Sequence, residues 1–308
     1  MGRYLLRRIP QTLLVLLGVV TMAFFMTHVV PGDPARLIAG ANASPEAVAS
    51  IHHELGLDEP LLTQYVNYLG DLLHGDLGTS FAQQNTPVVD QLVAALPVSV
   101  MVALGAVLWE VLLGVPIGII AALRPRGVLD RITMLGALLG LSAPPFWLGL
   151  LLLYYLAFKG NLFPLSGWGT PAIDYLILPT FALGVGGAAW YAQLTRTTML
   201  EVLRSPYVQM ARAKGMPEST IIRRHALRNV LTPLLTLLGM DLGYFLGGVV
   251  VIETVFGLPG VGKLTFDAIG TLDIPMITGA VLFAAFFIVL MNLVVDLAYA
   301  AIDPRVRL

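Results

Sequence analysis

The sequence predicts an all-α integral membrane protein with six transmembrane helices and both termini in the cytoplasm. The 308-residue chain is 57% hydrophobic and only 12% charged, whereas a soluble domain carries about 25% charged residues. The apolar residues also form stretches of about 20 residues or more, the length that a helix needs to cross a bilayer. Most of the surface is therefore expected to face lipid or other apolar protein.

Six stretches have the length and composition of a spanning helix. In chain order they are roughly Ile9–Val30, Pro97–Leu123, Ile132–Phe158, Tyr175–Met199, Val230–Ile252 and Pro275–Ala301. A basic start precedes the first stretch, but this apolar run is too long for a cleavable signal peptide and has no small-residue cleavage pattern. We expect residues 1–30 to form a cytoplasmic tip and a retained first span.

The basic residues orient these spans, because cytoplasmic segments carry an excess of Lys and Arg. With the N-terminus inside, all but three of the 18 Lys and Arg residues lie in or beside cytoplasmic segments; the exceptions are Arg36, Lys159 and Lys263. Residues 31–96 are rich in acids and are expected to form an external lobe. Its amphipathic stretch Leu61–Leu73 fits a helix that either lies on the membrane or outer mouth, or packs within the lobe.

Proline and glycine interrupt several spans. The pair Pro144–Pro145 removes two backbone donors, so the third span is expected to kink or break there. Glycines spaced four apart, such as Gly114 with Gly118 and Gly136 with Gly140, allow helices to approach closely. Helix packing explains the glycines, whereas the prolines fit either a packing kink or a bend that opens a pathway.

A basic segment, residues 205–229, separates the fourth and fifth spans on the predicted cytoplasmic side. Ser205 suits a helix N-cap, Pro206 the first helical turn, Gly215 the position after a helix end, and Pro217 the start of a second helix. Two short helices joined at a glycine indicate a surface that grips a partner. The positive charge by itself has another explanation: cytoplasmic loops of membrane proteins are basic even when they bind no partner.

Three acids fall inside predicted spans: Glu110, Asp241 and Asp296. A charge within the bilayer is costly, so such residues usually face a cavity or a partner helix. Glu110 and Asp241, near the middle of their spans, are candidates for a polar translocation path. Asp296 is a further pathway candidate, although its place near a cytoplasmic end also fits a helix-end or inter-subunit hydrogen bond. A secondary carrier or channel would use such acids too.

Several chemistries are excluded or disfavoured. The chain has no cysteine, which excludes disulfides and thiolate metal sites. The segment Gly257–Thr265 nearly matches a phosphate-binding loop, but Leu264 stands where a Mg²⁺-binding Ser or Thr must follow the lysine. We expect an external turn instead, with Glu253, Phe256 and Gly257 as candidates for an external gate. No catalytic residue, metal site, bound cofactor or nucleic-acid partner is expected.

The segment Tyr207–Pro233 resembles the cytoplasmic loop shared by permease subunits of ABC importers. The family's glycine falls on Gly215 and an alanine on Ala211, while Gln209 and Met210 replace its Glu and first Ala. The string ARAKG followed by RHALRN is typical of the dipeptide/oligopeptide branch. The N-terminal LLRRIPQTLL, the PGDP turn, ETVFGLPGVGKL and the closing DLAYAAIDPR also resemble its B-type permease subunit.

This resemblance covers nearly the whole chain and implies the type I ABC importer permease fold. Residues 97–308 would form the transmembrane core, with 205–229 as the coupling loop that contacts the ATPase subunits. The contact residues so implied are Tyr207, Ala211, Arg212, Ala213, Lys214, Gly215, Arg223 and Arg224.

The resemblance also implies the partners. The chain would pair with a homologous C-type permease in a prokaryotic cytoplasmic membrane and receive peptide from an external substrate-binding protein. Two cytoplasmic ABC ATPases would bind ATP and Mg²⁺. The alternative is a self-sufficient secondary carrier or channel, which has no need of the loop motif and often contains repeats that this sequence lacks. The cargo stays open among dipeptides, oligopeptides, glutathione, nickel complexes and haem.

Overall fold

The computed structural model describes residues 2–29, 35–36, 43–54, 56–83, 86–247 and 249–302. The PGDP turn (residues 31–34) and the final residues 303–308 lie outside this part of the chain. Within it, five helices are long and apolar enough to cross a membrane. These candidate spans are Ile9–Met26, Val88–Leu123, Ala172–Leu203, Glu218–Leu246 and Ile274–Val295.

The described chain is almost entirely helical. The first half contains α1 (Gly2–Val29), α3 (Pro45–Glu54), α4 (Leu61–Leu73), the two-residue antiparallel strands β1 (Thr79–Ser80) and β2 (Thr86–Pro87), α5 (Val88–Leu123), α6 (Val128–Ser142), α7 (Pro145–Leu152) and the π-helical η1 (Leu153–Lys159). The second half contains α8 (Ala172–Leu203), α9 (Pro206–Ala213), α10 (Glu218–Ile221), the π-helical η2 (Ile222–Ala226), α11 (Leu227–Leu246), α12 (Val250–Phe256), α13 (Val261–Thr271) and α14 (Ile274–Ile302).

The predicted break at the double proline is confirmed. Helix α6 ends at Ser142, Pro144 is extended (φ −61°, ψ 131°), and Pro145 occupies the first turn of α7. Proline favours an extended conformation at the residue before it and lacks the N–H that a continuing helix would use. The third predicted span is therefore two consecutive helical pieces rather than one helix.

Two predicted boundaries are wrong. The fifth predicted span continued to Ile252, but α11 ends at Leu246, and Ile252 belongs to the separate helix α12. Gly247 follows α11 as its C-cap residue, with an ordinary right-handed backbone conformation (φ −66°, ψ −5°). The second span was predicted to start at Pro97, but α5 already starts at Val88 and carries Pro97 inside it.

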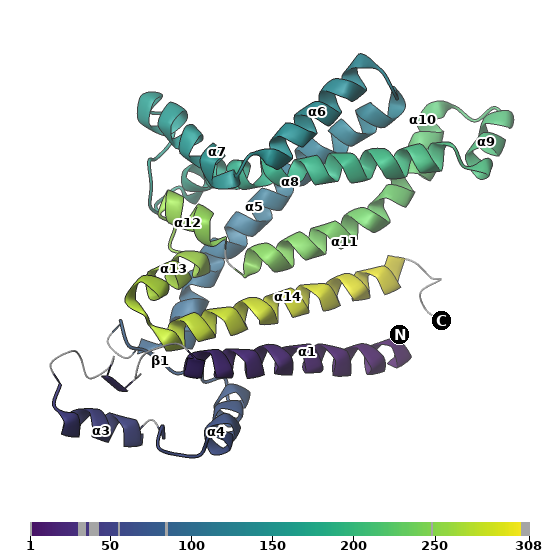
Figure 1. Ribbon diagram of the computed structural model, residues 1–308. Helices are drawn as coiled ribbons and strands as arrows, with labels where there is room; N and C mark the ends of the chain where they lie inside the picture. Colours follow the sequence, from purple (N-terminus) through teal and green to yellow (C-terminus); the bar gives the residue numbers. More distant parts are fainter. Residues whose placement is uncertain are drawn as a thin grey trace.

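Helices α5 and α8 pack closely at the centre of the molecule (Figure 1). A Cβ added at Gly114 of α5 would lie 2.5 Å from the carbonyl oxygen of Ala188, and one added at Gly184 of α8 would lie 2.5 Å from that of Ala106. The predicted close packing at Gly114 is thus confirmed. At Gly136 of α6 it is wrong within this chain, because an added Cβ would have no atom within 4 Å.

The elements separate towards two ends. Figure 1 shows the start of α1, the end of α14 and the α9–α10 pair at one end, and α3 and α13 at the other. Helix α4 has the predicted bounds Leu61–Leu73 and no buried residue. It contacts α1 through Tyr65: the Tyr65 hydroxyl lies 2.7 Å from the Thr21 hydroxyl of α1, and the Tyr65 ring packs edge-on against Phe24 of α1. The position of the start of α1 and the end of α14 beside the α9–α10 pair agrees with the predicted placement of both termini on the side of residues 205–229.

Candidate functional site

The predicted helix–turn–helix in residues 205–229 is present. Pro206 is the first residue of α9, as expected, and Pro217 precedes α10. Ser205 occupies the N-cap position, but its side chain makes no capping hydrogen bond; its hydroxyl donates instead to the carbonyl of Val202 (2.5 Å). The Gly215 N–H donates to the carbonyl of Arg212 (2.9 Å), and the Met216 N–H donates to that of Ala211 (3.2 Å). These two hydrogen bonds form a Schellman motif, and Gly215 supplies the left-handed residue it requires (φ 76°).

Three buried side chains form a small core within this turn. Val208, Ala211 and Ile221 pack together, against Met216 and against Val202 and Leu203 at the end of α8. Ala211 is only 8% exposed, so its small side chain serves the internal packing of the loop and not its outer surface.

The outer surface of the loop is apolar and basic. Tyr207 and Met210 are 45% and 61% exposed. The other residues implied in ATPase contact that are exposed are Arg212, Ala213, Lys214, Gly215, Arg223 and Arg224. An apolar pair bordered by cations on a projecting helix is suited to a protein partner.

Arg212 is engaged within the loop. Its Nε donates to Oε1 of Glu218 at 2.6 Å, and its Nη1 donates to the carbonyl of Leu203 at 3.2 Å. This pair links α9 to α10, but both side chains are exposed to solvent, so it contributes little to stability.

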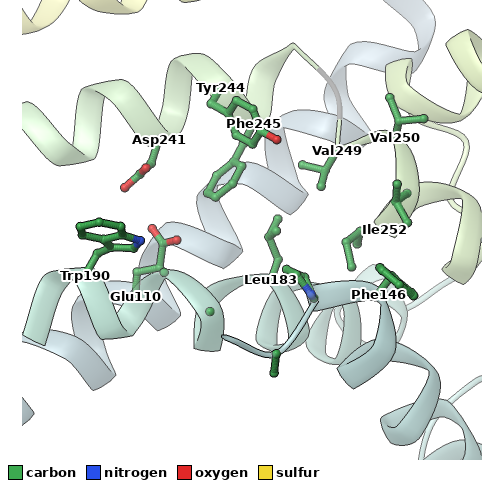
Figure 2. A pocket seen from close by; sticks show the side chains of 15 residues that line it. Glu110, Phe146, Leu183, Trp190, Asp241, Tyr244, Phe245, Val249, Val250 and Ile252 are labelled. Carbon is green, nitrogen blue, oxygen red and sulfur yellow. The ribbon is translucent and has the colours of Figure 1, made fainter. Parts of the chain in front are cut away.

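A pocket of about 510 Å³ lies where the helices are broken. It opens between the N-terminal turn of α7, the middle of α8, the end of α11 and the start of α12. Its lining residues include Glu110, Phe146, Trp190, Asp241, Tyr244 and Phe245 (Figure 2). The structure thus brings together two of the three intramembrane acids, which come from α5 and α11. Asp296 belongs to α14, and its side chain lies outside the described part of the structure.

The two acids have different surroundings. Glu110 is 1% exposed, and its Oε2 has no hydrogen-bond partner. Asp241 is half-buried and accepts a hydrogen bond from the Tyr191 hydroxyl at 2.7 Å. The sequence analysis did not identify Tyr191 or Trp190, because aromatic residues in an apolar helix carry no distinctive sequence signal.

Glu253, a candidate for the external gate, is fully buried and holds the loop before α13. Its Oε1 accepts the Ser99 hydroxyl (2.7 Å), and its Oε2 accepts the Lys263 N–H (3.0 Å). The Ser99 oxygen in turn accepts the Val261 N–H (2.9 Å). A Cβ at Gly260 would collide with the carboxyl group. The P-loop-like segment therefore cradles the chain's own carboxylate, as helix N-termini do with anions.

The other two gate candidates close the same corner. Phe256 is 4% exposed, and its carbonyl accepts the Gly167 N–H at 2.9 Å. Gly257 ends α12 in the left-handed conformation. Neither residue, nor Glu253, lines the large pocket, whereas Val250, the first residue of α12, does.

One ion pair escaped the sequence analysis. Arg196 of α8 donates through Nε to Oδ1 of Asp130 (2.6 Å) and through Nη2 to Oδ2 (2.9 Å). The Arg126 N–H also donates to Oδ2 (2.9 Å). These hydrogen bonds, chiefly those from Arg196, hold the pKa of Asp130 below its usual range. This ion pair connects the turn between α5 and α6 to α8. The only hint of it in the sequence was a single acid, Asp130, within the basic residues 124–131.

The fold has relatives among solved transporters. The structures of the MetNI methionine ABC transporter in inward-facing conformations include a chain that matches 69% of this one and 96% of its own length, with a TM-score of 0.56 and 18% identity. An amino acid ABC transporter solved with histidines has a chain with a TM-score of 0.53, 16% identity, and 70% and 94% coverage. The fold is therefore that of an ABC transporter permease.

The chain belongs to the family of binding-protein-dependent transport system inner membrane components, whose model matches residues 114–308, while the N-terminal model of such components matches residues 1–103. The chain is 40% identical to the dipeptide transport system permease protein DppB of Lactococcus lactis, with both chains fully covered. It is 38% identical to the glutathione transport system permease protein GsiC of Salmonella choleraesuis, over 100% of this chain and 99% of the relative.

Proposed function

We propose that this chain is the B-type pathway subunit of an ATP-driven importer that carries short peptides across a prokaryotic cytoplasmic membrane. The observation that carries this proposal is the full-length similarity to permeases named for dipeptide and glutathione transport. The chain would be non-catalytic. ATP and Mg²⁺ would bind to two partner ATPases, and an external binding protein would deliver the peptide to the end that carries α3 and α4.

Chain continuity gives the proposal a mechanism. Helix α8 runs into α9, and α10 runs through η2 into α11, so both helices next to residues 205–229 also line the large pocket. A displacement of the α9–α10 pair by ATPase subunits would therefore move Trp190 and Asp241 directly. Closely packed helices transmit such shifts, because protein interiors deform little.

The exposed side of the pocket suggests the place of the second permease. Phe146, Trp190 and Tyr244 line the pocket and are 43%, 56% and 70% exposed. Exposed aromatic residues around a cavity are suited to a partner surface. We infer that a homologous C-type permease covers this side and completes the pathway, with α6, α7 and η1 together serving as the sixth span.

The test is Gly215→Trp in the importer assembled with its second permease, ATPases and binding protein in proteoliposomes. A Cβ added at Gly215 would meet no atom within 4 Å, so we expect the indole to project from the loop into the ATPase contact. We expect normal membrane insertion and loss of substrate-stimulated ATP hydrolysis. Stimulation at the wild-type level would rule out the coupling role.

Two controls separate bulk from backbone strain. Gly215→Asn should retain stimulation, because Asn tolerates the left-handed conformation and adds little volume. Gly75→Trp places the same bulk at a residue with the same kind of backbone (φ 79°) and equally open surroundings, next to α4. It should leave ATPase co-purification unchanged. Peptide uptake without any ATPase subunit would instead identify a secondary carrier.

A further inference from the structure

The large pocket combines acidic and aromatic side chains in one place. Among its described lining residues are the acids Glu110 and Asp241 and no Lys, Arg or His. Figure 2 shows both carboxyl groups directed into the same space beside the Trp190 indole. Ionisable groups inside a membrane helix bundle usually face a cavity or pair with another polar group, and they often mark a substrate or proton pathway.

Glu110 is held firmly with one oxygen unpartnered. The side chain lies against the backbone of α8, where a Cβ at Gly187 would collide with Oε1. Its Oε2 is buried without a hydrogen bond. Because a buried acceptor without a donor is costly, this atom is available to a ligand that brings a donor.

Asp241 leaves acceptor capacity as well. Its Oδ2 accepts the Tyr191 hydroxyl, yet a carboxylate offers about four lone-pair positions. An alkylammonium group has three N–H donors and one positive charge. One such group between the two carboxyls would supply the missing donor to Glu110 and offset one negative charge.

The rest of the lining suits an organic cation. Trp190 and Tyr244 expose much of their surface beside the acids, and ammonium groups bind over aromatic faces, best over Trp. The volume of about 510 Å³ falls in the range of small-molecule sites, roughly 300–1,000 Å³.

We propose that this pocket binds the free α-ammonium group of a peptide in transit, through Glu110 and Asp241 with Trp190 beside them. The inference rests on the proposed function, because a peptide enters the pathway only if peptides are the cargo. It also predicts a preference within the pathway itself, separate from that of the external binding protein.

The test is equilibrium dialysis of labelled alanyl-alanine against the complete complex in nanodiscs, without binding protein or nucleotide. The comparison ligand is propionyl-alanine, which has the same shape but no amino group. We expect wild type to bind alanyl-alanine about tenfold more tightly, because charge-assisted hydrogen bonds are the stronger ones. If wild type bound the two ligands equally, this result alone would overturn the proposal, and no variant would be needed.

Substitutions test which residues produce the preference for alanyl-alanine over propionyl-alanine. Glu110→Gln and Asp241→Asn should each reduce it to a few-fold or less. Trp190→Leu, which keeps both acids, should weaken it partially. Asp174→Asn alters an exposed acid of α8 outside the pocket and should preserve it. An unchanged preference in both acid variants would refute the site, and so would competition by KCl as strong as that by butylammonium chloride.

Butylammonium also separates this inference from the proposed function. If the complex takes up alanyl-alanine with its binding protein but shows no acid-dependent preference, the importer assignment stands and the ammonium site fails. If butylammonium binds through Glu110 and Asp241 but alanyl-alanine is neither bound nor taken up, peptide cargo fails and with it the role of this site in transit.

Discussion

At the scale of single residues, the polar side chains that matter most are buried acids with defined donors. Glu253 holds the loop before α13, and Asp130 holds the turn before α6. Each acid lies far along the chain from a side chain that satisfies it, Ser99 or Arg196. A buried carboxylate of this kind stabilises the fold only while its donors are present, because an unpaired buried charge is strongly unfavourable.

Arg196→Ala should lower the melting temperature of the purified complex. The side chain of Asp130 is only 6% exposed, and loss of its partner should cost about 3 kcal/mol. Arg196→Lys should recover only part of this, since Lys cannot form the two-pronged contact. Arg204→Ala, at the exposed end of α8, is the control and should have little effect. Equal melting temperatures for Arg196→Ala and Arg204→Ala would contradict the assignment.

The same pair predicts a pH dependence. Because the pKa of Asp130 is lowered in the folded protein, the pair contributes fully above the ordinary Asp range, about pH 4, and loses its contribution as pH falls through the lowered value. The difference in melting temperature between wild type and Arg196→Ala should therefore be full at about pH 7 and shrink at acidic pH, as Asp130 becomes protonated first in the variant and then in wild type. A difference that does not shrink at acidic pH would contradict the role of the Asp130 charge.

Gly260→Ala should destabilise the external corner, because the added Cβ would collide with the Glu253 carboxyl. The matched control is Gly270→Ala on α13, where the Cβ would meet no atom within 4 Å; it should be neutral or slightly stabilising, since Ala favours helix more than Gly. Thermal unfolding of the purified complex distinguishes the two, and equal stability would show that the cradle adapts easily.

At the scale of elements, glycines decide which helices approach closely. The α5–α8 contact depends on residues such as Gly114 and Gly184, whose missing side chains let backbone lie against backbone. Helix α6 carries glycines at the same spacing, but Gly136 faces open space and an added Cβ at Gly140 would have an ordinary contact of 3.7 Å. The four-residue spacing therefore marks where close packing is allowed and not where it occurs.

Gly114→Ala should impair the assembly or stability of the permease. The new Cβ would lie 2.5 Å from the Ala188 carbonyl oxygen and from the Tyr191 Cβ, so α5 and α8 would have to separate, at a cost of about 1–3 kcal/mol or more. Gly136→Ala makes the same chemical change on α6 and should be tolerated. Melting temperature and yield of assembled complex report on both, and similar values would refute the packing role of Gly114.

At the scale of the whole molecule, the two ends of the helix bundle carry different elements. The ends of α1 and α14 lie on the side of the α9–α10 pair, and α3 lies at the other end (Figure 1). Basic residues on the first side and acids on the second agree with the topology rule. The orientation remains a prediction, and the absence of native cysteine makes it directly testable.

Single cysteines should report opposite sides. Thr63→Cys on α4 and Ser219→Cys on α10 both replace exposed residues. In intact cells whose outer surface is accessible to reagent, a membrane-impermeant maleimide should label Thr63→Cys, and should label Ser219→Cys only after the membrane is permeabilised. Labelling in the reverse order would invert the predicted topology.

The positions of most spans, the break at Pro144 and the helix–turn–helix around Gly215 could be predicted from the sequence, because each depends on local properties: apolar length, missing backbone donors and helix-terminal residues. The tertiary structure alone decided that Glu110 meets Asp241, that Glu253 fills the P-loop-like turn, and that Arg196 reaches Asp130. The first and third contacts join residues more than 60 positions apart in the chain. Glu253 is close in sequence to its turn, but it also accepts a hydrogen bond from the distant Ser99 of α5. Local propensities carry no information on such contacts; only the packing of α5, α6, α8, α11 and α12 brings these groups together.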